Sequence, residues 1–161
     1  MSTQAPDQAP YRPATYVGTH ADRPAVITST GHVVTFAELE ERSCRLAQAL
    51  YTHGLRPGDH VAVLLPNDHR THEVAFGLQR SGLYYTLVNT HLADEEAAYI
   101  VNDCGASVLI TSSALAALAS DLVVLTPGVG LRLMIGLIGM RTSPRGRPVA
   151  LIIVRLGGRS N

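Results

Sequence analysis

The chain has 161 residues and a mass of 17.2 kDa, enough for one domain with a modest hydrophobic core. Thirteen basic and thirteen acidic side chains give a formal net charge of zero, which argues against a general nucleic-acid-binding protein or a polybasic membrane-surface protein. Two cysteines without CxxC spacing, and no apolar signal segment at the start, predict a reduced, cytoplasmic protein.

The amino-terminal residues predict a short disordered stretch followed by a hairpin. Residues 1–16 contain three prolines among polar side chains and no apolar period, so we expect a flexible lead-in there. Two apolar runs, Pro24–Ile27 and Val33–Val34, flank turn-forming residues. This arrangement predicts a small hairpin or two short strands.

A helix is predicted to follow the second of these runs. Thr35 stands three residues before Glu38, the spacing of a capping box, in which each side chain accepts a hydrogen bond from the other residue's backbone N–H. Apolar positions then recur at helical spacing as far as Leu50. Gly54 supplies the left-handed residue that ends such a helix.

The next fifty residues alternate between strand-like and helix-like patterns. Continuous apolar runs predict strands buried on both faces, and their short connections are typical of βαβ crossovers. The predicted strands cover 61–65, 84–88 and 108–111, and the predicted helices cover 68–81 and 94–103. The fold class is therefore α/β, a partial doubly wound parallel sheet with flanking helices. Because three parallel strands leave open edges, we expect more polypeptide to pair with them.

Glycine-containing segments do not predict a nucleotide-binding loop. Gly77 and Gly82 have the offset of a Walker A loop, but Leu83 and Tyr84 follow where Lys and Ser or Thr are needed. The run 128–133 is one glycine short of the dinucleotide fingerprint, and a flexible turn explains it better.

Other candidate site residues have ordinary structural explanations. His69 and His72 are three apart beside Glu73, but zinc needs a third or fourth ligand that the sequence does not identify, so solvated histidines are favoured. Tyr84 and Tyr85 either line a pocket or, as we favour, lie in the core. Cys44 and Cys104 are expected to be buried helix cysteines, with no disulfide or catalytic thiol.

The segment from about Val17 to Ala119 resembles the amino-terminal part of AMP-forming fatty acyl-CoA synthetases, most closely the fatty-acid-CoA ligases of actinobacteria. The resemblance is carried by Pro24–Ile27, 35–50, 56–67 and the run GLYYTLVNTHLADEEAAYIVNDCGA at 82–106. Its most specific residues are Tyr84, Tyr85, Asn89, His91, Tyr99 and Asp103. Two departures affect loop geometry: Leu87 stands where relatives usually have Pro, and the turn 92–94 looks one residue short.

The resemblance implies an enzyme that activates a fatty acid with ATP to an acyl-adenylate and pyrophosphate, then transfers the acyl group to coenzyme A. In that family ATP, Mg²⁺ and CoA are held by a phosphate loop, an acid, an Arg and a Lys that come from sequence after the matched part. We therefore assign no catalytic, cofactor-binding or metal residue to this chain. Without Lys it cannot supply the ammonium groups that neutralise the charge of adenylation, so we expect it to be inactive alone.

The composition changes near residue 120. Residues 1–119 hold seven Arg and twelve acidic residues, whereas 120–161 hold six Arg, one acidic residue and seven of the fourteen Gly. We expect 17–119 to be the synthetase-like part and 120–161 an unrelated tail, poorly ordered or produced by a frameshift near codon 120. The rival explanation is a membrane anchor over Leu122–Met140. This segment would span a membrane poorly because it contains proline, glycines and Arg132.

Two functions remain open. The first is a truncated fatty-acid-CoA ligase. The second is a non-catalytic α/β module that binds a partner, conceivably another synthetase chain, or a small membrane-associated protein. Co-purification with a synthetase favours the second, and aggregation or rapid proteolysis favours the first.

Overall fold

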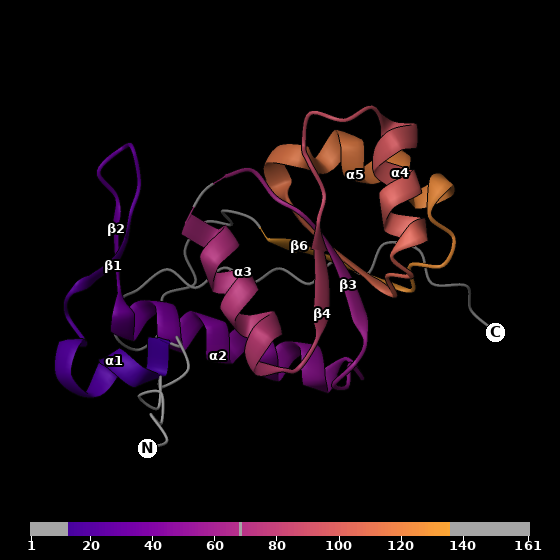
Figure 1. Cartoon of the computed structure of the whole chain (residues 1–161). Helices are drawn as coiled ribbons and strands as arrows, with labels where there is room; N and C mark the ends of the chain where they lie inside the picture. The colour runs from indigo at the N-terminus through magenta and orange to yellow at the C-terminus, as the bar shows by residue number, and fades with distance from the viewer. Residues whose placement is uncertain (1–12, 68, 136–161) are drawn as a thin grey trace, which may run out of the picture.

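A computed structural model describes residues 13–67 and 69–135, which form a four-stranded parallel sheet between two pairs of helices, with a small hairpin beside one pair (Figure 1). The helices are α1 (Pro13–His20), α2 (Phe36–Thr52), α3 (His69–Arg80), α4 (Asp94–Asp103) and α5 (Ala116–Leu125), with a 3₁₀ turn, η1, at Ser113–Leu115. The strands are β1 (Pro24–Ile27), β2 (Val33–Thr35), β3 (His60–Leu64), β4 (Tyr84–Leu87), β5 (Val108–Ser112) and β6 (Leu131–Ile135).

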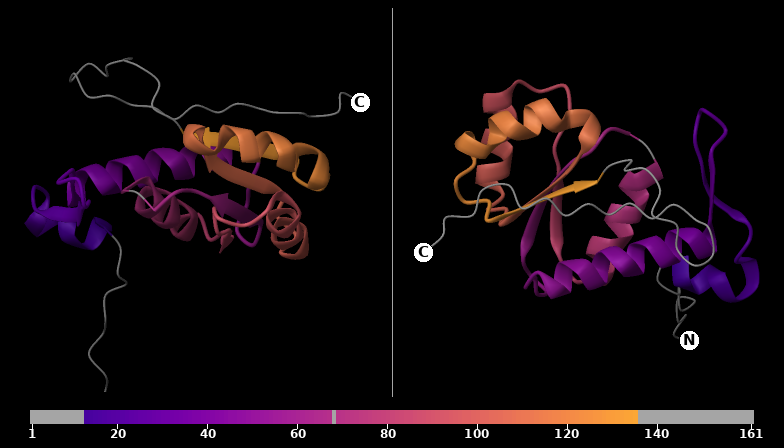
Figure 2. Two further views of the ribbon diagram at one scale, coloured as in Figure 1. Left: turned by 90° about the horizontal axis from the view of Figure 1, so that it is seen from above. Right: turned by 180° about the vertical axis from the view of Figure 1, so that it is seen from behind.

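The parallel sheet has the order β4-β3-β5-β6. The chain leaves β3 toward β4 on one side, then passes over β3 to β5 and continues to β6 on the other side. This reversal of direction is the mark of a doubly wound sheet, and it places α3 and α4, the helices of the two successive crossovers, on opposite faces. Figure 2 shows α2 and α3 on one side of the sheet and α4 and α5 on the other. The predicted fold class is confirmed.

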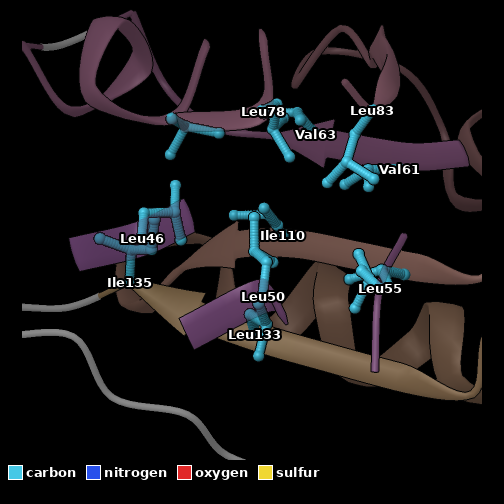
Figure 3. Close-up of a cluster of buried hydrophobic side chains, with 12 residues drawn as sticks. Leu46, Leu50, Leu55, Val61, Val63, Leu78, Leu83, Ile110, Leu133 and Ile135 are labelled. Carbon is cyan, nitrogen blue, oxygen red and sulfur yellow. The ribbon is translucent and has the colours of Figure 1, made fainter. Parts of the chain in front are cut away.

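Two hydrophobic clusters lie on the two faces of the sheet. Because side chains alternate along a strand, Val61 and Val63 of β3 face α2 and α3, whereas Ala62 and Leu64 face α4 and α5. The first cluster joins helix residues such as Leu50 to the sheet, and Figure 3 shows its side chains directed toward one another. Burial on both faces explains the continuous apolar runs in the sequence.

The start of α2 is the predicted capping box. The Glu38 backbone N–H donates to the Thr35 hydroxyl at 3.2 Å, and the Thr35 backbone N–H donates to the Glu38 carboxylate at 3.1 Å. Gly54 follows the helix with φ of +95°, a conformation that favours glycine. The predicted α2, hairpin, α3, α4 and first three parallel strands are present, with ends that differ from the expected ones by at most two residues.

The amino-terminal boundary differs from the expected one. Residues 13–16, expected in the flexible lead-in, form the first half of α1. The ring of Tyr16 packs on Phe36, the first residue of α2, with centroids 5.1 Å apart. This aromatic contact holds α1 against α2 although the sequence shows no apolar period there; residues 1–12 lie outside the described residues.

The region after residue 119 is a second correction. Helix α5 crosses the expected boundary, and β6 pairs with β5 in parallel, with Val108 opposite Leu131. Leu122, Val129 and Leu133 are buried, so residues 120–135 pack as part of the sheet and are not the poorly ordered tail that we expected. This strand was not predicted because Arg132 interrupts its apolar run and glycines precede it. Residues 136–161 lie outside the described residues.

Part of the segment considered as a membrane anchor lies among the described residues. Residues 122–135 form the end of α5, a turn and β6. Within residues 13–67 and 69–135, no helix is long and apolar enough to cross a membrane.

Close contact between α2 and α3 depends on a helical glycine. A Cβ atom added at Gly77 would lie 2.8 Å from Cδ2 of Leu46, well inside contact distance. Two ion pairs flank this contact: Arg42 with Glu73 at 2.6 Å and Arg80 with Glu40 at 2.5 Å. The glycine that fitted a Walker A offset therefore serves helix packing.

We predict that Gly77→Val destabilises the fold by about 1–3 kcal/mol, because the added methyl groups collide with Leu46 in a close-packed interface. Gly18→Ala is the matched control, since nothing lies within 4 Å of its added Cβ, and it should stabilise the protein by about 0.5–1 kcal/mol. Urea unfolding measures both. A Gly77→Val protein as stable as the parent would contradict the close approach.

Candidate functional site

The carboxyl ends of β3 and β5 are the natural candidate for a site. Ligands of doubly wound sheets bind outside the carboxyl ends of the strands, where the strand order reverses. Here that position lies between the ends of β3 and β5, where Leu64 pairs with Thr111. Beyond β3, the Thr71 hydroxyl donates to the Pro66 carbonyl oxygen at 3.0 Å and ties the first turn of α3 to this edge.

The end of β5 carries two buried hydroxyl groups. Thr111 is 2% exposed and Ser112 is fully buried, and neither hydroxyl has a hydrogen-bond partner among the described residues. By strand alternation they point to opposite faces of the sheet. A buried hydroxyl without a partner costs about 1–3 kcal/mol, so these groups suit an incoming neutral hydrogen-bonding partner. They provide no charge.

Two residues of the specific resemblance follow β4 at the same edge. The Asn89 side-chain oxygen accepts a hydrogen bond from the His91 backbone N–H at 3.0 Å, which fixes the turn toward α4. The Ala93 backbone N–H donates to the Glu96 carboxylate at 3.1 Å and caps α4 in turn. These polar groups thus shape the loop after β4.

Tyr84 and Tyr85 do not lie in the core. They are 63% and 41% exposed, and they stand at the amino end of β4, away from the candidate edge. The Tyr84 ring packs against His60, with centroids 5.1 Å apart. The core interpretation is wrong because β4 is the outermost strand of the described sheet and most of its residues are exposed.

Of the three residues considered for a metal, two make other contacts and the third, His72, is exposed. Glu73 is paired with Arg42 across the α2–α3 interface, and the ring of His69 packs on His32 of the hairpin, with centroids 4.7 Å apart. No group of three potential metal-ligating side chains comes together within residues 13–67 and 69–135.

The glycine turns do not form a phosphate cradle. Five glycines have positive φ, and the backbone N–H of each donates to a carbonyl oxygen of this chain. Gly130, in the fingerprint-like run, donates to the Ser107 carbonyl oxygen at 3.0 Å and belongs to the turn that leads into β6. Phosphate binding needs backbone N–H groups that point at the ligand, so these turns do not fit ATP.

Cys44 lies in a small polar cluster on α2. Arg80 donates to its sulfur at 2.8 Å, and the thiol donates to the Glu40 carboxylate at 3.3 Å. Partial burial raises the pKa of the Cys44 thiol and Glu40 adds to this effect, whereas Arg80 opposes it. The cluster borders a shallow depression of about 390 Å³ floored by Leu50, Leu55 and Leu83. A thiol with a raised pKa is a poor nucleophile at neutral pH.

The expectation that both cysteines are buried in helices is wrong. Cys44 is exposed, and Cys104 is half-buried at the residue that follows α4. Both are free thiols. On α2 the Cys44 side chain lies against the polar groups of Glu40 and Arg80, and it is not among the buried residues of that helix.

Arg132 is a buried cation that sequence analysis treated only as an obstacle to a membrane span. It is 4% exposed on β6, and Nη2 donates to the Thr126 carbonyl and hydroxyl oxygens, both at 2.9 Å. Its Nε and Nη1 have no partner among the described residues, and burial lowers its pKa. The guanidinium binds the carboxyl end of α5, where the helix dipole favours a cation.

Comparisons with known proteins agree on one family. The model of a family described as AMP-binding enzyme matches residues 14–133. A coprinoferrin synthetase of Coprinopsis cinerea is 41% identical over 81 residues, which cover 50% of this chain and 3% of that protein. A long-chain-fatty-acid–CoA ligase of Escherichia coli O6:H1 is 38% identical over 98 residues, which cover 60% of this chain and 17% of the ligase.

A solved structure shows the same relation. The o-succinylbenzoate coenzyme A synthetase of Bacillus subtilis, in complex with ATP and magnesium ion, superposes with a TM-score of 0.59 at 31% identity. The match covers 63% of this chain and 28% of that one. This chain therefore spans only a small part of the length of the proteins that it matches.

We predict that Glu40→Gln, in a Cys104→Ala background that leaves one thiol, moves the midpoint of the pH–rate profile for alkylation to lower pH. The carboxylate raises the Cys44 pKa, so its removal leaves the opposing Arg80 and increases the thiolate fraction near neutral pH. Iodoacetamide should then react several-fold faster. Glu41→Gln is the control, because Glu41 pairs with Arg45. An unchanged or higher midpoint would contradict the cluster.

We further predict that Arg132→Met changes the free energy of unfolding by less than about 1 kcal/mol, because an apolar side chain of similar length removes a buried charge whose desolvation offsets its hydrogen bonds. Thr126→Val should instead cost about 1–3 kcal/mol, since it removes an acceptor and leaves the guanidinium buried. Thermal and urea unfolding test the order of the two effects; the reverse order contradicts it.

Proposed function

Because the chain belongs to the AMP-binding enzyme family, we propose that it is the amino-terminal segment of the large domain of a fatty-acid–CoA ligase. The observation that carries the proposal is the match over 98 residues to a long-chain-fatty-acid–CoA ligase, beside the family match over residues 14–133. The sequence resemblance at 82–106 supports the same substrate class.

The parent reaction joins a fatty acid to coenzyme A in two steps. The carboxylate first attacks ATP to give an acyl-adenylate and release pyrophosphate, and the CoA thiol then displaces AMP. ATP and Mg²⁺ supply the activated phosphate and its charge neutralisation. In this proposal the groups that hold them lie in the part of the ligase that this chain does not span, which is most of its length.

The residues of this chain do not fit ATP. The chain has no Lys, the positive-φ glycines donate their N–H groups to its own carbonyl oxygens, and the candidate edge offers neutral hydroxyls. Adenylyl transfer needs preorganised donors and cations aimed at the phosphates. We therefore assign no chemical step to these residues and propose that the 161-residue chain has no ligase activity alone. In this proposal its role is structural, because it provides a parallel sheet of the ligase domain.

We predict no ATP–pyrophosphate exchange above background with medium-chain or long-chain fatty acids when the purified chain is assayed alone. The Escherichia coli ligase serves as the positive control in the same assay. Acyl-AMP formed by the 161-residue chain, free of contaminating ligase, would overturn the proposal of inactivity.

A chimera tests the ligase assignment itself. Residues 14–133 of this chain, the part that the family model matches, replace the corresponding segment of the Escherichia coli ligase. Retained ATP-dependent acyl-CoA synthesis supports the proposal that this segment builds a ligase domain. A soluble chimera that has lost the activity would count against it, with the unmodified ligase carried through the same preparation as control.

A further inference from the structure

Among the described residues, no strand pairs with the outer edge of β4. β4 is the last strand on its side of the described sheet, and Tyr84, Tyr85 and Leu87 are 63%, 41% and 60% exposed. The opposite outer strand, β6, has only intermediate and buried residues. In Figure 1, β4 lies at the front of the sheet, between α3 and α4. The two outer strands thus differ, and β4 is the one that leaves apolar side chains in water.

The backbone of this edge has unused hydrogen-bonding groups. The N–H groups of Tyr84 and Val88 donate inward, to the Asp59 and Val63 carbonyl oxygens at 3.0 Å and 2.8 Å. Since N–H and C=O of one residue point to the same side of a strand and alternate along it, Tyr85 and Leu87 direct theirs outward. Residues 84–87 also contain no charged residue and no proline, the features with which proteins usually blunt an edge.

We propose that this edge pairs with β4 of a second copy of the chain, antiparallel about a two-fold axis at Thr86. The two outward-facing residues are two positions apart, so Tyr85 of one copy meets Leu87 of the other as a hydrogen-bonded pair, and the symmetry repeats the pair. Four N–H···O bonds form, and each Tyr85 ring lies across from a Leu87 side chain. The edge is therefore complementary to itself.

Charge does not oppose this pairing. β4 carries no ionisable group except the tyrosine hydroxyls, and the formal net charge of the chain is zero, so two copies bring no like charges together at the contact. Two paired four-residue strands bury a small area, which places the dimer among weak, concentration-dependent assemblies.

Sedimentation equilibrium of the full chain over a range of concentrations tests the proposal. We expect a monomer–dimer equilibrium, together with hydrogen exchange at the Tyr85 and Leu87 amides that slows as the dimer forms. Leu87→Pro should raise the dimer dissociation constant at least tenfold, because it removes an outward N–H that the monomer does not use. Proline is also the residue that the acyl-CoA synthetases resembled by this sequence usually have at this position.

Two further variants keep the outcome decisive if Leu87→Pro unfolds the strand. Leu87→Lys places two like charges near the two-fold axis and should weaken the dimer, whereas Val124→Lys, at an 83% exposed position of α5, should leave it unchanged. A chain that stays monomeric at every concentration would overturn the proposal, as would slow exchange of the Tyr85 and Leu87 amides in the monomer, or a dimer insensitive to both Leu87 changes. These experiments do not measure ligase activity. Their outcome therefore does not depend on whether the proposed function is correct.

Discussion

Burial of β3 and β5 on both faces is the constraint on which the rest of the structure depends. All five residues of β5 are buried, as are the last four of β3, so each strand needs a helical layer above and below. The doubly wound order meets this need, since reversing direction after β4 sends α4 and α5 to the face that α2 and α3 leave open. Hydrophobic burial thereby fixes the topology before any polar contact acts.

The polar contacts adjust what that burial has arranged. Gly77 lets α2 and α3 approach closely, and ion pairs on either side of it, Arg42 with Glu73 and Arg80 with Glu40, hold the two helices in one register. Partly exposed ion pairs contribute little to stability, so their effect is mainly on alignment. The same alignment places Cys44 beside Arg80. The environment of this thiol therefore follows from the packing of α2 against α3, and not from the candidate site at the carboxyl ends of the strands.

Local sequence signals predicted the helices and strands. The exposure of their side chains depends on the order of the strands in the sheet, which is set by contacts between distant parts of the chain. The capping box at Thr35 and the acidic first turn of α4 act within one helical turn, so the sequence shows them directly. The exposure of Tyr84 and Tyr85 depends on which strand lies at the edge, which strand patterns do not reveal. The strand β6 was not predicted because Arg132 interrupts its apolar run. The buried charge is tolerated because Thr126, at the end of α5, accepts hydrogen bonds from the guanidinium.

Most arginines of residues 13–67 and 69–135 contact other groups of the chain. Five arginines bind carboxylates, carbonyl oxygens or an aromatic ring within the chain: Arg42, Arg45, Arg56, Arg80 and Arg132. Moving Arg42, Arg80 or Arg132 to a phosphate would leave a partly buried acceptor without its partner. At the β3–β5 edge the hydroxyls of Thr111 and Ser112 are buried without a partner among the described residues and carry no charge, which agrees with the proposal that the cations for adenylyl transfer come from other polypeptide.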